Sequence, residues 1–102
     1  SEILKRKPEY VPAHVNMGLA LAGEGKISDA IRHYSEALRL DADNIFAHTL
    51  MGLARFETGK YDTAVFHFRE ALRINPDDPA IRSRLEMALS QKNKLNMEGS
   101  KK

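Results

Sequence analysis

The feature that most constrains the fold of this chain is a gap-free internal repeat of 34 residues. When residues 11–44 are aligned with residues 45–78, 15 of the 34 positions are identical. The identical pairs are Ala13/Ala47, His14/His48, Met17/Met51, Gly18/Gly52, Leu19/Leu53, Ala20/Ala54, Gly25/Gly59, Lys26/Lys60, Ala30/Ala64, His33/His67, Glu36/Glu70, Ala37/Ala71, Leu38/Leu72, Arg39/Arg73 and Asp43/Asp77. A repeat without insertions indicates equivalent units that stack on one another, because one unit of this size cannot bury its apolar face alone.

Each repeat begins with a segment that has the pattern of a helix. These first helices are predicted over residues 12–24 and 46–58. Both contain an internal glycine, Gly18 and Gly52. A glycine inside a helix costs about 1 kcal/mol relative to alanine, so its use in both copies indicates that another helix approaches closely at this point.

A second helix follows in each repeat after a glycine turn. Gly25 and Gly59 are placed to end the first helices, and Ser28 and Asp62 are the predicted N-caps of the second helices. Apolar residues at offsets of three and four form one face of each second helix. These residues are Ala30, Ile31, Tyr34, Ala37 and Leu38 in the first copy and Ala64, Val65, Phe68, Ala71 and Leu72 in the second.

The rest of the chain completes an all-α organisation. Asn44 and Asp78 are predicted to cap the helices that follow them, and no segment alternates with the period of a strand. The predicted parts are the end of a preceding helix and a linker at 1–10, repeats at 11–44 and 45–78, a capping helix at 79–93, and a disordered basic tail at 94–102.

The repeat resembles the tetratricopeptide repeat, whose 34 residues carry a fixed pattern of small and aromatic positions. The residues at these positions are His14, Met17, Gly18, Leu21, Ala30, Tyr34, Ala37 and Ala42, then His48, Met51, Gly52, Arg55, Ala64, Phe68, Ala71 and Pro76. The chain departs from the pattern with His for Trp, Met for Leu, Arg55 for an aromatic residue and Ala42 for Pro. The resemblance implies a right-handed α-solenoid of antiparallel helix pairs, with two full repeats and a C-terminal capping helix.

The same resemblance implies a concave groove lined by the first helix of each unit. The groove residues carried over from the family's positions are Val15, Asn16, Leu19, Phe46, Thr49, Leu50, Leu53, Phe56, Arg84 and Met87. Most are apolar, and an exposed apolar strip is typical of an interaction site. We therefore expect a protein–protein interaction module that binds an apolar protein or peptide segment, with Phe46, Leu53 and Phe56 as anchors.

Two narrower binding modes of the family do not fit these residues. Repeats that grip the acidic C-terminus of heat-shock chaperones use Lys, Asn, Asn, Lys and Arg at five positions. This chain has Val15, Leu19, Leu50, Ala80 and Arg84 there, and only the arginine agrees. Repeats fused to O-linked glycosyltransferases carry a ladder of asparagines, of which only Asn16 is present.

An alternative function is that of a C-terminal regulatory or substrate-recognition segment of a larger enzyme such as a glycosyltransferase. The chain itself has no recognisable nucleophile context or glycine-rich phosphate loop, so we expect no enzymatic activity and no cofactor. With 0 cysteines, a thiolate site is excluded.

The charge distribution argues against a nucleic-acid partner. The net charge of +2 comes from the two ends, whereas residues 8–81 carry seven basic and eleven acidic side chains. No apolar run reaches the length of a membrane span, and no signal segment is present. The compartment stays unknown, with the cytoplasm slightly favoured.

The four histidines are expected to recur only because the repeat recurs, and not because they form a site. His14 and His48 are predicted to pack between helices, and His33 and His67 to be exposed. Equivalent residues on neighbouring units lie about 8–10 Å apart, too far for two imidazoles to share one zinc ion. No metal site is therefore predicted.

The first repeat lacks most of the helix that would cover it from the N-terminal side. Met17 and Leu21 are accordingly expected to be partly exposed, or to be covered by a second copy of the chain. Self-association through this uncapped N-terminal face is a third possibility.

Overall fold

The computed structural model describes residues 10–100, with side chains as far as Met97. This part of the chain contains helices and no strands, as the sequence predicts. The helices are α2 (Tyr10–Gly23), α3 (Ile27–Leu40), α4 (Ile45–Glu57), α5 (Tyr61–Ile74) and α6 (Pro79–Ser100). The predicted segment 1–10 lies outside the described residues except for Tyr10, as do residues 101 and 102.

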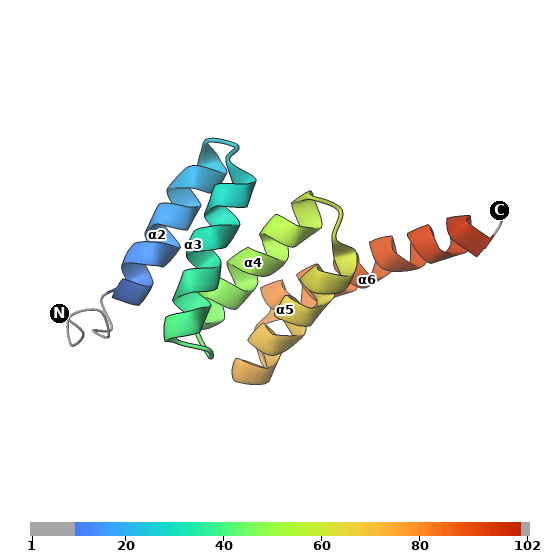
Figure 1. The fold of residues 1–102 in the computed structure, drawn as a ribbon. Helices are drawn as coiled ribbons and strands as arrows, with labels where there is room; N and C mark the ends of the chain where they lie inside the picture. Colours follow the sequence, from blue (N-terminus) through green and yellow to red (C-terminus); the bar gives the residue numbers. More distant parts are fainter. Residues whose placement is uncertain (1–9, 101–102) are drawn as a thin grey trace.

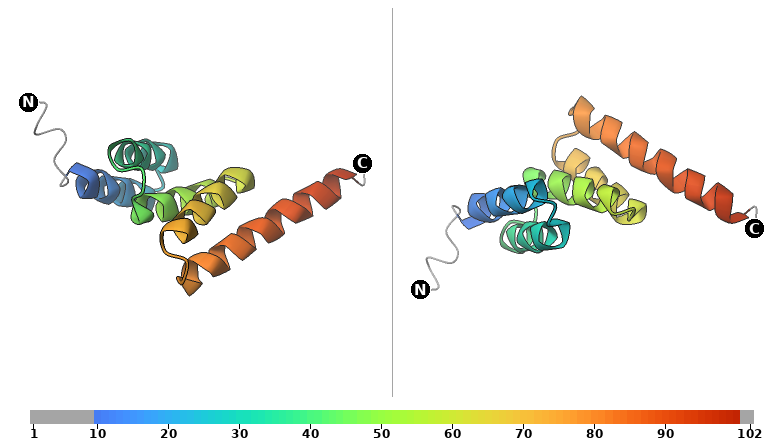
Figure 2. Two further views of the ribbon diagram at one scale, coloured as in Figure 1. Left: turned by 90° about the horizontal axis from the view of Figure 1, so that it is seen from below. Right: turned by 90° about the horizontal axis from the view of Figure 1, so that it is seen from above.

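The helices form two antiparallel hairpins that stack side by side (Figure 1). The pairs α2–α3 and α4–α5 each form one hairpin, α3 packs against α4, and α6 packs against α5. The result is an elongated α-solenoid that measures 56 × 30 × 20 Å and ends in the long helix α6 (Figure 2).

Each hairpin is closed by an aromatic ring that lies against a glycine. A Cβ atom placed on Gly18 would lie 2.4 Å from Tyr34 Cε1, and one on Gly52 would lie 2.6 Å from Phe68 Cε1. Tyr34 and Phe68 are also the largest fully buried side chains among the described residues. The two glycines therefore let the first helix approach the ring of the second, as their repeated use in the sequence indicates.

The turns between paired helices use glycine in the left-handed conformation. Gly25 has φ +81° and Gly59 has φ +77°. In the first turn, the residue after the glycine is Lys26. Its backbone N–H donates a hydrogen bond of 2.8 Å to the carbonyl of Leu21, five residues earlier in the chain. This Schellman arrangement requires a residue that tolerates positive φ.

The structure corrects the predicted starts of the second helices. These helices begin at Ile27 and Tyr61, so Ser28 and Asp62 lie in the first turn instead of capping it. The N-cap residues are Lys26 and Lys60, whose side chains make no capping hydrogen bond. The Schellman turn sets the chain direction here, so the second helix follows at once without a side-chain cap.

The predicted caps of α4 and α6 are confirmed. Asn44 Oδ1 accepts a hydrogen bond from the Ala47 N–H at 2.9 Å. Asp78 Oδ1 accepts hydrogen bonds from the N–H groups of Ala80 at 3.0 Å and Ile81 at 3.1 Å. These bonds satisfy N–H groups that a helix start leaves free.

Helix α6 is longer than the sequence predicts. It runs to Ser100 instead of ending near residue 93, so residues 94–100 are helical where a disordered tail is expected. The helix is held against α5 by Ile81 and Ala88, which are buried, and by an ion pair of 3.0 Å between Lys92 and Asp62. No proline or other stop follows in residues 94–98, so the helix continues beyond residue 93.

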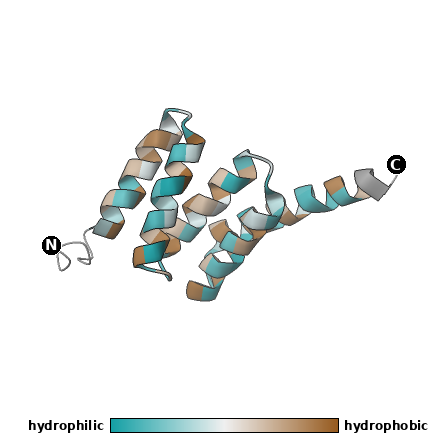
Figure 3. Ribbon diagram, in the orientation of Figure 1, coloured by the Kyte–Doolittle hydropathy of each residue, from teal (hydrophilic) through white to brown (hydrophobic). Residues whose placement is uncertain are grey.

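Helices α3 and α5 are amphipathic, whereas α2 is apolar over most of its length. Hydrophilic residues recur along α3, α5 and α6 (Figure 3). No helix between Tyr10 and Ser100 combines the length and apolar character that crossing a membrane requires.

The glycine–aromatic contact gives a stability prediction. We expect Gly52→Ala to lower the free energy of unfolding by about 1–3 kcal/mol, because the new methyl group overlaps the buried Phe68 ring. Denaturant unfolding followed by circular dichroism measures this change.

The matched control is Gly23→Ala, which also lies in a helix but has nothing within 4 Å of the added Cβ. This substitution should be neutral or stabilising by up to about 1 kcal/mol. Equal effects of the two alanines would contradict the role assigned to Gly52.

Candidate functional site

The principal concave site is a groove formed by the first helix of each unit. It has a volume of about 760 Å³ and lies across α2, the start of α4 and the start of α6. The residues that line it are Pro12, Val15, Asn16, Leu19, Asn44, Ile45, Phe46, Thr49, Leu50, Asn75, Asp78, Ala80, Ile81 and Arg84.

The structure brings seven of the ten predicted groove residues together in this groove. These are Val15, Asn16, Leu19, Phe46, Thr49, Leu50 and Arg84. The sequence analysis missed the cap residues Asn44, Asn75 and Asp78, which reach the groove because the loops between units open at the same end. Their capping pattern was visible in the sequence, but nothing in it shows which end of the helices forms the groove.

The other three predicted residues lie elsewhere. Phe56 is half-buried, with its ring edge-on to Tyr61 at a centroid distance of 5.2 Å. Leu53 also packs against the core between α5 and α6, and Met87 is exposed on α6 outside the groove. Phe56 and Leu53 therefore pack against the hydrophobic core of the second unit and do not line the groove.

Two apolar side chains of the groove are unusually exposed. Phe46 is 68% exposed and Leu19 is 45% exposed, whereas Val15, which also lines the groove, is buried. The hydroxyl of Thr49 donates to the carbonyl of Ile45 at 2.8 Å, so this polar group is satisfied within its own helix. The centre of the groove thus presents apolar surface with few free polar groups.

The charged groups of the groove lie at the end formed by α6. The Asp78 carboxylate is engaged by the first N–H groups of α6, while Arg84 forms no ion pair with any described residue. Within residues 10–97, the groove therefore has an apolar centre and, at its edge, the cation Arg84 without an ion-pair partner.

A second polar feature is a histidine pair inside each hairpin. His14 Nδ1 lies 3.2 Å from His33 Nδ1, and His48 Nδ1 lies 3.1 Å from His67 Nδ1. The ring planes are tilted by 34° in the first pair and by 37° in the second. The sequence analysis considers only equivalent histidines on neighbouring units, which it expects to lie too far apart to interact. The pairs that form lie within one hairpin, whose two helices pack directly against each other.

The burial of the histidines also differs in part from the prediction. His48 is buried and His14 is half-buried between helices, as expected. His33 and His67 are half-buried and not exposed. Because the two helices of a hairpin approach closely at the glycine, the rings of His33 and His67 lie against His14 and His48 and are partly covered.

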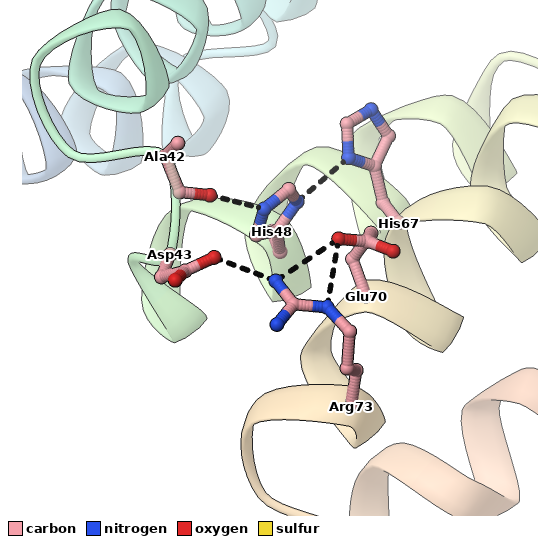
Figure 4. A network of polar contacts seen from close by, with 6 residues as sticks. All are labelled: Ala42, Asp43, His48, His67, Glu70 and Arg73. Atoms are coloured by element: carbon pink, nitrogen blue, oxygen red, sulfur yellow. Dashed lines mark hydrogen bonds and ion pairs between the residues drawn. The ribbon is translucent and has the colours of Figure 1, made fainter.

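The second pair has a defined hydrogen-bond direction (Figure 4). His48 Nε2–H donates to the carbonyl of Ala42 at 2.9 Å, which leaves His48 Nδ1 as an acceptor for His67 Nδ1–H. Burial, with the charges of His48 and Arg55, lowers the pKa of His67 to about 4. The ring of His67 is therefore neutral at physiological pH.

An arginine network surrounds this pair. Arg73 donates to Asp43 at 2.6 Å and to Glu70 at 3.2 Å, and so links the loop after α3 to helix α5 (Figure 4). In the first repeat, Arg39 makes the corresponding contact with Glu36. Among the described residues, no group of three or more His, Cys, Asp or Glu side chains is arranged to hold a metal ion.

The comparisons with known proteins agree with this geometry. A family model described as TPR repeat matches residues 18–59, and one described as tetratricopeptide repeat matches residues 45–78. No curated protein matches the chain significantly. Among solved structures, "Second TPR of Spaghetti (RPAP3) bound to HSP90 peptide SRMEEVD" is similar, with 20% identity and a TM-score of 0.82 over 91% of this chain and 86% of that one.

The solved structure shares the fold, and the two family models together cover residues 18–78. The chain therefore belongs to the tetratricopeptide repeat family.

Proposed function

We propose that this domain is a protein-interaction module whose groove binds an apolar peptide segment of a partner protein. Tetratricopeptide repeats are interaction scaffolds, and the similar solved structure holds a peptide. The observation that carries the proposal is the exposure of Phe46 and Leu19 within one groove. Burying a side chain of this size contributes about 1.5–3 kcal/mol, enough for a peptide anchor.

The groove also favours a direction for the bound peptide. Arg84 is an unpaired cation at the α6 end of the groove, and Asn16 offers an exposed amide on α2. A peptide with apolar residues over Phe46 and an acidic side chain near Arg84 would match both features. The apolar contact supplies affinity and the charge contributes orientation.

A substitution at Phe46 tests the groove. Phe46 is the second residue of α4, where an acidic side chain is favourable to the helix, so Phe46→Asp should keep the fold. Peptides selected from a random display library on the unmodified domain should be rich in apolar residues. Their affinity for the Phe46→Asp domain should fall about tenfold or more in fluorescence polarisation.

The matched control is Phe66→Asp. Phe66 is 55% exposed on α5 and does not line the groove, so this change should leave binding unaltered. Equal losses for the two variants, or a Phe46→Asp domain that binds as well as the unmodified one, would contradict the groove assignment.

The groove also predicts that an acidic C-terminal peptide is a poor ligand. The five positions that form the carboxylate clamp in related repeats all lie along this groove, but four of them are Val15, Leu19, Leu50 and Ala80. Only Arg84 can pair with a carboxylate. We therefore expect the peptide SRMEEVD to bind far more weakly than the selected apolar peptides, and saturable binding of comparable strength by calorimetry would show that this account is wrong.

A specific difference between the repeats supports a second interaction. Met17 is 51% exposed whereas its equivalent Met51 is 4% exposed, because α3 covers α4 and no described residue covers α2 in the same way. Ala13 and Ala20 are likewise exposed beside Met17. We infer that a second copy of the chain associates with this face of α2.

Sedimentation equilibrium tests this association. The unmodified protein should show a monomer–dimer equilibrium, and Met17→Lys should shift it towards the monomer, because a charge would be buried in the contact. Met87→Lys, on the exposed face of α6, is the control and should leave the equilibrium unchanged. A protein that is monomeric at all concentrations would exclude self-association through this face.

A further inference from the structure

We propose that each histidine pair is a two-imidazole site for a divalent late transition metal such as Zn²⁺, and that His14–His33 binds it more tightly than His48–His67. The sequence analysis predicts no metal site, but it compares histidines on neighbouring repeats. The pairs that meet are those within one hairpin.

The spacing of the nitrogens suits a shared ion. Zinc binds imidazole nitrogen at about 2.0–2.1 Å, which places two ligand nitrogens about 2.9 Å apart at a right angle and about 3.4 Å apart at a tetrahedral angle. The observed separations of 3.2 and 3.1 Å lie in this interval. Chelation then requires the two rings to turn so that both Nδ1 lone pairs point to the ion instead of along the Nδ1–Nδ1 line. In the second pair this turn competes with the hydrogen bond from His48 to Ala42.

The hydrogen bonds fix which nitrogen of His48 carries a lone pair. His48 donates its Nε2–H to the Ala42 carbonyl, so its Nδ1 carries the lone pair, which accepts the His67 Nδ1–H in the metal-free pair. Metal-binding histidines typically have their second nitrogen held in this way. The other nitrogen of His67 points away from the pair (Figure 4). Moving the His67 proton to that nitrogen frees Nδ1 without net release of a proton.

The protein supplies two ligands to each ion and water completes the coordination. Glu36 and Glu70 lie three residues beyond His33 and His67, but Arg39 and Arg73 hold their carboxylates. This arrangement is consistent with the lack of a three-ligand group among the described residues.

One neighbouring residue distinguishes the two pairs. Arg55 acts electrostatically on His67, and its buried Nε atom has no hydrogen-bond partner. The equivalent residue of the first repeat is Leu21. A guanidinium beside the site repels a dication, so the second pair binds metal more weakly than the first.

Titration of the unmodified domain with ZnCl₂ alone tests the proposal. Calorimetry and long-range ¹H–¹⁵N spectra of the imidazoles monitor the titration. The Nδ1 signals of His14 and His33 should shift first, and those of His48 and His67 at higher zinc concentration. His33→Gln should weaken the stronger site about tenfold or more, because it leaves a single imidazole. Arg55→Leu should bring the second site close to the affinity of the first.

Circular dichroism of each variant checks that the helices are retained, and the spectra of the unmodified domain give an answer even where a variant does not fold. Absence of zinc binding, or binding that leaves all four imidazole spectra unchanged, would overturn the proposal. Arg55→Leu without effect on the second site would overturn the assigned order of the sites.

Discussion

The close contact between a glycine and an aromatic ring sets the geometry of each repeat. Gly18 faces Tyr34 and Gly52 faces Phe68 at distances that exclude a Cβ atom. Since the rings are fully buried, the two helices of a hairpin can come no closer and cannot separate without opening a cavity. Other features depend on this spacing: the opposed histidines of each hairpin and the placement of α2 and α4 along one groove.

The groove follows from the way in which the hairpins stack. The buried faces of α3 and α5 carry the core, so the first helices α2, α4 and α6 are left with one side turned to the groove. On that side, Leu19 and Phe46 expose apolar side chains to solvent. Exposed apolar side chains in a concave surface are typical of an interaction site, and they are the basis of the function proposed for this groove.

The sequence predicts the all-α repeat because its 34-residue period, its paired glycines and its apolar stripes all agree. It fails where a local pattern competes with three-dimensional context. Ser28 and Asp62 have the chemistry of N-caps, but the second helices start two residues earlier, directly after the left-handed turns at Gly25 and Gly59. The sequence predicts too short an α6, because a polar composition without helical periodicity indicates disorder although nothing in residues 94–98 stops a helix.

The site residues show the same limit. Family positions predict Phe46, Leu19 and Phe56 for the groove. Phe46 and Leu19 line the concave surface, whereas the ring of Phe56 packs on Tyr61, a contact that family positions do not reveal. The histidine pairs were missed because the repeat period draws attention to equivalent residues, while the contacts run between residues 19 apart in one hairpin.

The central claim is that a partner binds between α2, α4 and α6. Chemical-shift mapping of the labelled domain with a selected apolar peptide tests it most directly. The account predicts that the largest amide shifts cluster at Asn16, Leu19, Phe46 and Arg84, with little change on the outer face of α5. Shifts that cluster instead around Phe66, with none along the groove, would contradict it.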